Sequence, residues 1–73
     1  MVLISYIKPY VVVTSDRLFS GSLDIYDKSG TEIIRKDFSD ESFLNVKIIR
    51  RAGSRISVVL HSGGTVMKKK FLT

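Results

Sequence analysis

The sequence predicts a single all-β domain, a small antiparallel Ig-like β-sandwich of six or seven strands. Two observations point to β-structure: apolar and polar residues alternate along most of the chain, and turn-forming residues recur about every ten positions. In addition, no long stretch carries apolar side chains at a helical period. A small β-barrel has the same pattern and is the alternative architecture.

The length and composition limit how such a chain can be stabilised. Its 73 residues leave room for one core, so residues 1–73 form one domain. The chain has no cysteine and one histidine, which excludes disulfides and a zinc site as supports. A hydrophobic fraction of 44% indicates that apolar packing holds the fold.

The first third of the chain is predicted to form three strands. Val2 to Ile7 and Tyr10 to Thr14 are rich in β-branched residues and flank Pro9, which cannot donate to a sheet and marks a bend. Ser15-Asp16 is predicted to turn the chain, and Arg17 to Tyr26 forms the next strand.

A hairpin follows at Asp27-Lys28-Ser29-Gly30. This segment matches a type I turn, because Asp caps its own backbone in the first position and Gly accepts a positive φ in the last. With three loop residues, Ile25 is expected to face Ile33, and Asp24 to face Ile34.

The centre of the chain alternates between polar and apolar stretches. The acidic segment from Asp37 to Ser42 is predicted to be a connection, and Phe43 to Ile49 a strand. Arg50 to Ser54 is predicted to reverse the chain before a strand from Arg55 to His61. The inward residues of these two strands are expected to be Leu44, Val46, Ile48, Ile56, Val58 and Leu60.

Gly63-Gly64 supplies the two-residue loop that tight hairpins favour. The resulting register directs Met67 and Phe71 inward, and Lys68 and Lys70 outward. It also places Lys69 on the inner side, which is explained if the last strand is an edge strand whose lysine blocks further strand addition. Homo-oligomerisation through a strand edge is the related alternative.

The residues for catalysis are missing. His61 is the only histidine and is expected to be an exposed ring at a strand end, without a nucleophile to activate. Asp37, Asp40 and Glu41 are close enough in sequence for a carboxylate pair or a calcium site, but their spacing is not specific for either, and they are expected to form a solvated acidic loop. No phosphate-binding or dinucleotide fingerprint is found, so we expect a non-enzymatic protein without a cofactor or a metal.

Charge is distributed unevenly along the chain, whose net charge is +5. Residues 1–34 carry a net charge of −1 and residues 35–73 carry +6, with no acidic residue after Glu41. The register above brings part of this charge together in a candidate basic patch. The patch consists of Arg50, Arg51, Arg55, Lys68, Lys69 and Lys70.

A basic patch attracts acidic proteins and phosphate backbones alike. Small barrels that bind single strands place aromatic rings among their cations, but here only Phe71 lies in the basic segment, and it is expected to point inward. A protein partner is therefore expected first, with nucleic acid as the alternative and inhibition of an acidic target as a third hypothesis. Membrane insertion is not expected, because no apolar run approaches ~20 residues.

Several motifs in residues 22–73 carry a family resemblance. They include Leu23-Asp24-Ile25-Tyr26-Asp27, Ile56-Ser57-Val58-Val59-Leu60 and Lys69-Lys70-Phe71. This region resembles the C-terminal sorting domains of type IX secreted proteins and small secreted Ig-like domains of unknown function. The resemblance implies an Ig-like sandwich from a secreted or cell-surface protein, although the chain itself shows no signal peptide. It also implies that a secretion apparatus reads the closing strand, Thr65 to Thr73.

Overall fold

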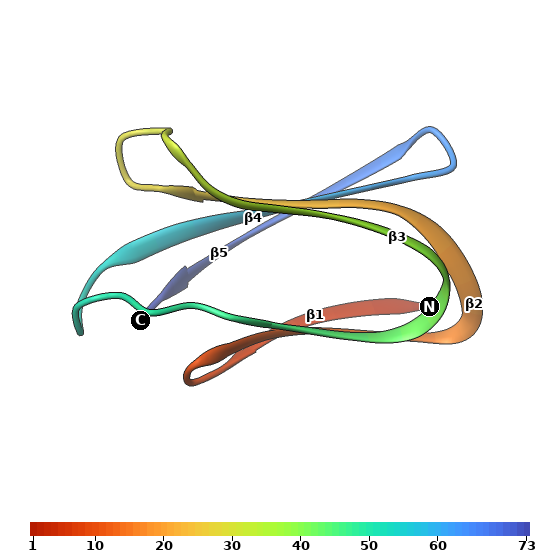
Figure 1. Cartoon of the computed structure of the whole chain (residues 1–73), viewed down its shortest axis with the longest axis horizontal. Helices are drawn as coiled ribbons and strands as arrows, with labels where there is room; N and C mark the ends of the chain where they lie inside the picture. Colours follow the sequence, from red (N-terminus) through yellow and green to blue (C-terminus); the bar gives the residue numbers. More distant parts are fainter.

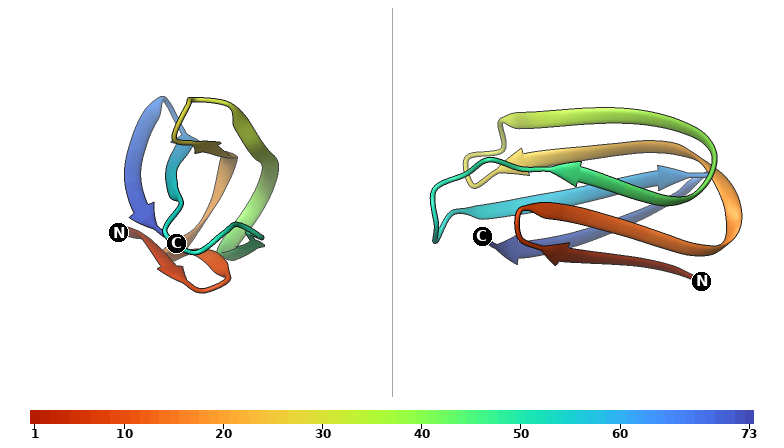
Figure 2. Two further views of the ribbon diagram at one scale, coloured as in Figure 1. Left: turned by 90° about the vertical axis from the view of Figure 1, so that its left-hand side faces the viewer. Right: turned by 60° about the horizontal axis from the view of Figure 1, so that its bottom comes forward.

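The computed structural model describes residues 1–73 and contains five antiparallel strands (Figure 1). They are β1 (Val2–Ile7), β2 (Tyr10–Asp27), β3 (Glu32–Lys47), β4 (Arg55–Ser62) and β5 (Thr65–Leu72). The all-β prediction is confirmed. The sheet curls into a half-barrel, which fits the small-barrel alternative (Figure 2). No helix suited to crossing a membrane is found.

The structure has five strands instead of six or seven because β2 and β3 are long and bent. The predicted turn at Ser15-Asp16 is wrong, since this segment lies inside β2. The predicted connection from Asp37 to Ser42 is wrong as well, since it lies inside β3. Polar residues occupy these stretches because both strands bend there, with irregular pairing beyond Thr14 and a positive φ of 53° at Asp40.

The bends divide the sheet into two layers. In the first layer, β1 pairs with the first half of β2, which pairs with the second half of β3. In the second layer, the first half of β3 pairs with the second half of β2, which pairs with β4, and β4 pairs with β5. Two strands therefore run through both layers, as Figure 1 shows.

The core lies between these layers and follows from the alternation within each strand. Eleven hydrophobic residues are buried there. Burying one such side chain contributes roughly 1.5–3 kcal/mol, so this cluster is the main source of stability. All six inward positions expected in β3, its extension and β4 are confirmed. The eleven residues are Ile4, Val11, Val13, Leu23, Ile25, Leu44, Val46, Ile48, Ile56, Val58 and Leu60.

The turn after β2 forms as predicted around the carboxylate of Asp27. Its Oδ1 accepts hydrogen bonds from the Ser29 amide at 2.9 Å, the Ser29 hydroxyl at 2.7 Å and the Thr31 amide at 3.0 Å. These bonds lower the pKa of Asp27 below its ordinary value, the Ser29 hydroxyl most of all. Gly30 takes the positive φ of 88° that the turn requires.

The strand register after this turn differs from the prediction by one residue. Ile25 pairs with Ile34 instead of Ile33, and Asp24 pairs with Arg35. The reason is an irregularity between Ile25 and Tyr26, which inserts a residue into the β3 side of the ladder.

The β4–β5 hairpin forms as predicted. Ser62 pairs with Thr65, which leaves Gly63 and Gly64 as a two-residue loop with φ values of 55° and 78°. Leu60 pairs with Met67 and Ile56 pairs with Phe71, as the loop length implies.

β5 is an edge strand, since it pairs only with β4. Side chains on the inner side of β5 contact β1, and we call this contact between the two strands the seam. The Lys69 ammonium donates a hydrogen bond of 3.1 Å to the carbonyl of Ile4, and the rings of Tyr6 and Phe71 lie 6.1 Å apart. Lys69 therefore occupies the free edge of β1, where another strand would otherwise add.

Candidate functional site

The outer side of β4 and β5 carries alternate residues of both strands, opposite the core positions. The register aligns Ser57 with Lys70, Val59 with Lys68, and His61 with Val66. On the β2 side, Tyr26 lies beside Ser57. We call this surface the basic face. It consists of Tyr26, Lys28, Arg55, Ser57, Val59, His61, Val66, Lys68, Lys70 and Leu72.

Four cations on the basic face have no acidic partner. Lys68 and Lys70 project from β5, Arg55 from β4, and Lys28 from the turn that follows β2. None of them takes part in an ion pair. No acidic residue occurs in residues 55–73, so nothing on β4 or β5 neutralises this charge. The surface is therefore suited to an anion.

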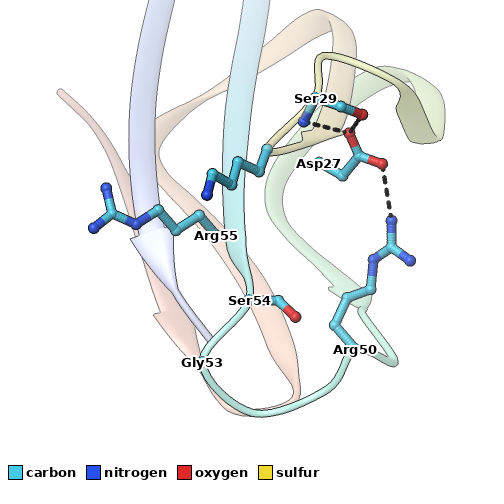
Figure 3. Close-up of a pocket in the computed structure, with 7 residues that line it drawn as sticks. Asp27, Ser29, Arg50, Gly53, Ser54 and Arg55 are labelled. Atoms are coloured by element: carbon cyan, nitrogen blue, oxygen red, sulfur yellow. Dashed lines mark hydrogen bonds and ion pairs between the residues drawn. The ribbon is translucent and has the colours of Figure 1, made fainter.

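A polar hollow lies at one end of the basic face (Figure 3). Arg50 reaches toward Asp27 across the hollow, and its Nη2 lies 3.6 Å from Oδ2 of the carboxylate. Arg55 extends away from this pair, from the start of β4. Ser29 and Ser54 also line the hollow, which contains no hydrophobic residue. Its cations are Lys28, Arg50 and Arg55, against the single carboxylate of Asp27.

The structure separates the six predicted patch residues into groups. Arg55, Lys68 and Lys70 lie together on the basic face. Arg50 is adjacent but paired with Asp27. Arg51 is exposed in the preceding loop, with its carbonyl accepting the Ser54 amide at 3.1 Å.

Lys69 is the one predicted residue whose charge lies elsewhere. Its ammonium is held at the seam by the Ile4 carbonyl and lies 5.7 Å from the centroid of the Phe71 ring. Because successive residues of a strand point to opposite sides, Lys69 cannot direct its charge to the same side as Lys68 and Lys70.

Exposed apolar side chains lie among the cations of the basic face. Val66 is 50% exposed and Leu72 is 65% exposed, while Val59 and Tyr26 are partly buried between the strands. Cations and exposed apolar side chains therefore alternate on this surface.

A buried carboxylate lies at the border of the basic face. Asp24 is only 3% exposed, and its Oδ1 makes no hydrogen bond. Its nearest cationic groups are Nη1 of Arg35 and Nε2 of His61, each at 3.8 Å from one carboxylate oxygen. Both distances exceed the range of a good hydrogen bond, so the Asp24 charge is only weakly compensated.

Lys28 and Tyr26 belong to the basic face but not to the patch that the sequence predicts. The sequence places Lys28 in the turn at Asp27-Lys28-Ser29-Gly30 and Tyr26 at the end of the preceding strand. The signal that reveals them is the pairing of β2 with β4, which is not local in sequence and places Tyr26 beside Ser57.

The acidic segment and the histidine are solvent-accessible, as expected. Asp37, Asp40 and Glu41 are exposed on β3, and the side chain of His61 is 49% exposed. No group of three or more His, Cys, Asp or Glu side chains is arranged to hold a metal ion.

Comparison with protein-family models, with curated proteins and with solved structures finds no match for this chain.

Proposed function

We propose that this chain is a non-enzymatic interaction module that holds an acidic protein segment on its basic face. The observation that carries the proposal is the set of unpaired cations, Lys28, Arg55, Lys68 and Lys70, interleaved with the exposed side chains of Val66 and Leu72. The cations would guide the approach of the segment, and the apolar groups would supply contact area.

The position of β5 supports an extended partner. This strand is an edge of the sheet, so the basic face continues to a row of backbone groups without a strand partner. An acidic segment lying along β5 would contact Lys68 and Lys70 with its carboxylates and the edge with its backbone.

The resemblance to sorting domains extends the proposal to the kind of protein in which the chain occurs. In this context the chain is an Ig-like module of a secreted or cell-surface protein, and a secretion apparatus reads β5. The lysines of β5 would then be the feature that the apparatus recognises.

The test is fluorescence anisotropy with a labelled polyglutamate peptide. We expect binding that weakens with salt and a loss of about tenfold or more in affinity for the double variant Lys68→Glu/Lys70→Glu. The matched control is Arg17→Glu/Lys36→Glu, which makes the same change of charge at two exposed cations away from the basic face. Equal losses for the two double variants would show that only net charge matters.

Single-stranded nucleic acid is the second candidate, and the position of Tyr26 favours it. The ring lies beside Ser57, in the same hollow as Lys68 and Lys70, where a base can stack while the lysines contact phosphates. The probe for this candidate is a single-stranded oligodeoxynucleotide that carries the same net charge as the polyglutamate peptide, and its affinity is compared with that of the peptide. Tighter binding of the oligonucleotide, with a loss in Tyr26→Ala, selects this function, whereas binding of neither probe contradicts both candidates.

A further inference from the structure

Three cations of the basic face line one hollow. Lys28 reaches it from the turn after β2, Arg55 from the start of β4, and Lys70 from β5. The hollow also contains Ser57, which pairs with Lys70 in the register of β4 and β5. We call it the three-cation hollow. It adjoins the polar hollow described above, with which it shares Lys28 and Arg55.

No acidic side chain compensates the charge of the three-cation hollow. None of its cations takes part in an ion pair, and no carboxylate lines it. The neighbouring carboxylate of Asp27 accepts the hydrogen bonds of its own turn and lies 3.6 Å from Arg50. Arg55 extends away from this pair (Figure 3). Like charges around one space repel each other, and an anion between them removes this repulsion.

The hydroxyl of Ser57 adds a neutral donor to the hollow. Ser57 is partly buried, and its side chain makes no hydrogen bond within the protein. A bound anion would accept a hydrogen bond from this hydroxyl and satisfy it. The donors of the hollow are therefore two ammonium groups, a guanidinium and a hydroxyl, and they come from three separate elements of the fold.

We infer that the three-cation hollow binds a phosphate group on a phosphorylated side chain of the acidic segment that the basic face holds. The inference rests on the function proposed above and specifies its partner. A phosphorylated side chain carries a charge of roughly −1.5 to −2 at neutral pH, and its three acceptor oxygens point in different directions. A carboxylate carries one negative charge and presents two oxygens in one plane. Donors from three elements therefore match a phosphate better than a carboxylate.

The register also predicts where an acidic residue of the partner lies relative to the phosphate. Lys68 and Lys70 lie on the same side of β5, about 7 Å apart along the strand. An extended segment beside β5 presents alternate residues to the same side. A carboxylate two positions from the phosphorylated residue would therefore reach Lys68 while the phosphate occupies the three-cation hollow.

Fluorescence anisotropy with three labelled peptides tests the inference, at about pH 7.5, where the phosphate is mainly dianionic. The first peptide is polyglutamate, the second has one central glutamate replaced by phosphoserine, and the third is longer than the first by one glutamate. The second and third carry the same net charge, so the ratio of their affinities reports the phosphate group itself. We expect the phosphopeptide to bind about tenfold or more tightly than the charge-matched peptide.

Single substitutions locate the phosphate. Lys28→Gln and Arg55→Gln each remove one charge from the three-cation hollow, and Ser57→Ala removes its hydroxyl. We expect each to lower the ratio of the two affinities by about fivefold or more. Lys68→Gln is the matched control, because it removes one charge of the basic face outside this hollow. It is expected to weaken both peptides equally and to leave the ratio unchanged, and circular dichroism reports whether each variant folds.

The outcomes separate this inference from the function on which it rests. Equal affinities for the phosphopeptide and the charge-matched peptide overturn the inference and leave the binding of acidic segments intact. A preference for the phosphopeptide that persists in folded Lys28→Gln and Arg55→Gln also overturns it, because the phosphate would then bind elsewhere. Binding of no peptide contradicts both. Tighter binding of a single-stranded oligodeoxynucleotide of the same charge overturns the inference as well, since the hollow would then take the phosphates of nucleic acid.

Discussion

The two outer faces of the sheet differ in chemistry although the same strands build them. On the first layer, β2 and β3 present Val12, Thr14 and Phe43 in a nearly uncharged surface. On the second layer, β4 and β5 present unpaired cations, and β2 contributes Tyr26. The difference shows that alternation buries one side of every strand in the core, while the residues on the other side can differ in chemistry between the two layers.

The largest effect is expected in the core that both faces share. Leu44→Ala in the first layer and Leu60→Ala in the second are each expected to lower the free energy of unfolding by ~2–5 kcal/mol, because both side chains are buried. Leu3→Ala on the exposed side of β1 is expected to change the free energy of unfolding by less than ~0.5 kcal/mol. Denaturant unfolding measures all three. A small effect at Leu44 alone would mean that the first layer is not part of a common core.

The next effect concerns the junction between the layers. A Cβ atom added to Gly21 would lie 1.9 Å from the backbone carbonyl oxygen of His61, so β2 and β4 approach too closely there for any side chain. Gly21→Ala is expected to cost ~1–3 kcal/mol or more in unfolding experiments, because the backbone must shift.

Gly30→Ala is the control for this prediction. A Cβ at Gly30 meets nothing, and only its positive φ of 88° opposes the change, at a cost of about 1 kcal/mol. Equal costs at both glycines would contradict the close contact of β2 with β4.

A smaller effect is expected at the buried carboxylate beside the basic face. Asp24→Asn removes a weakly compensated charge and is expected to change the free energy of unfolding by less than ~1 kcal/mol. Arg35→Ala removes the guanidinium that lies 3.8 Å from the Asp24 carboxylate and is expected to lower the free energy of unfolding by more than Asp24→Asn does. Asp24→Asn should also strengthen binding of the polyglutamate peptide, because it makes the surroundings of the basic face more positive. Weaker binding would contradict this interpretation.

The smallest effect is a pH dependence at the turn beside the hollow. The Ser29 hydroxyl and the Thr31 amide hold the pKa of Asp27 below its ordinary value of 3.8. The ionised carboxylate therefore stabilises the fold above pH 3.8, and this contribution is lost as the pH falls through the lowered pKa.

Asp27→Asn removes the charge of the side chain but keeps its size and shape. Its melting temperature is expected to lie below that of the unchanged protein at pH 7, with the difference narrowing below pH 3.8. A difference that does not vary with pH would show that hydrogen bonding alone stabilises the turn.

Local sequence signals predicted the parts of the fold that depend on alternation and tight turns. The hairpin at Gly63-Gly64 fixed the pairing of Met67 with Leu60, and from it the placement of Lys69 at the inner edge. These features follow from two or three residues each, so one sequence is sufficient to find them.

The bends could not be predicted in the same way. Ser15-Asp16 and the segment around Asp40 carry the residues of turns, but β2 and β3 pair before and after these segments, so each segment is a bend within a long strand. That pairing joins residues far apart in the sequence, and local propensity does not report it.

The candidate site was predicted in part for the same reason. Arg55, Lys68 and Lys70 lie on two strands joined by a short loop, so their proximity could be inferred from the register. Lys28 and Tyr26 reach the basic face only through the pairing of β2 with β4, which is not local in sequence.

The central claim is that the basic face binds an acidic partner through its unpaired cations. Fluorescence anisotropy of the labelled polyglutamate peptide with the chain, as salt is raised from about 50 mM to about 500 mM, tests it most directly. We predict that the peptide is released as the salt concentration rises. Retention of the peptide at high salt would contradict the claim.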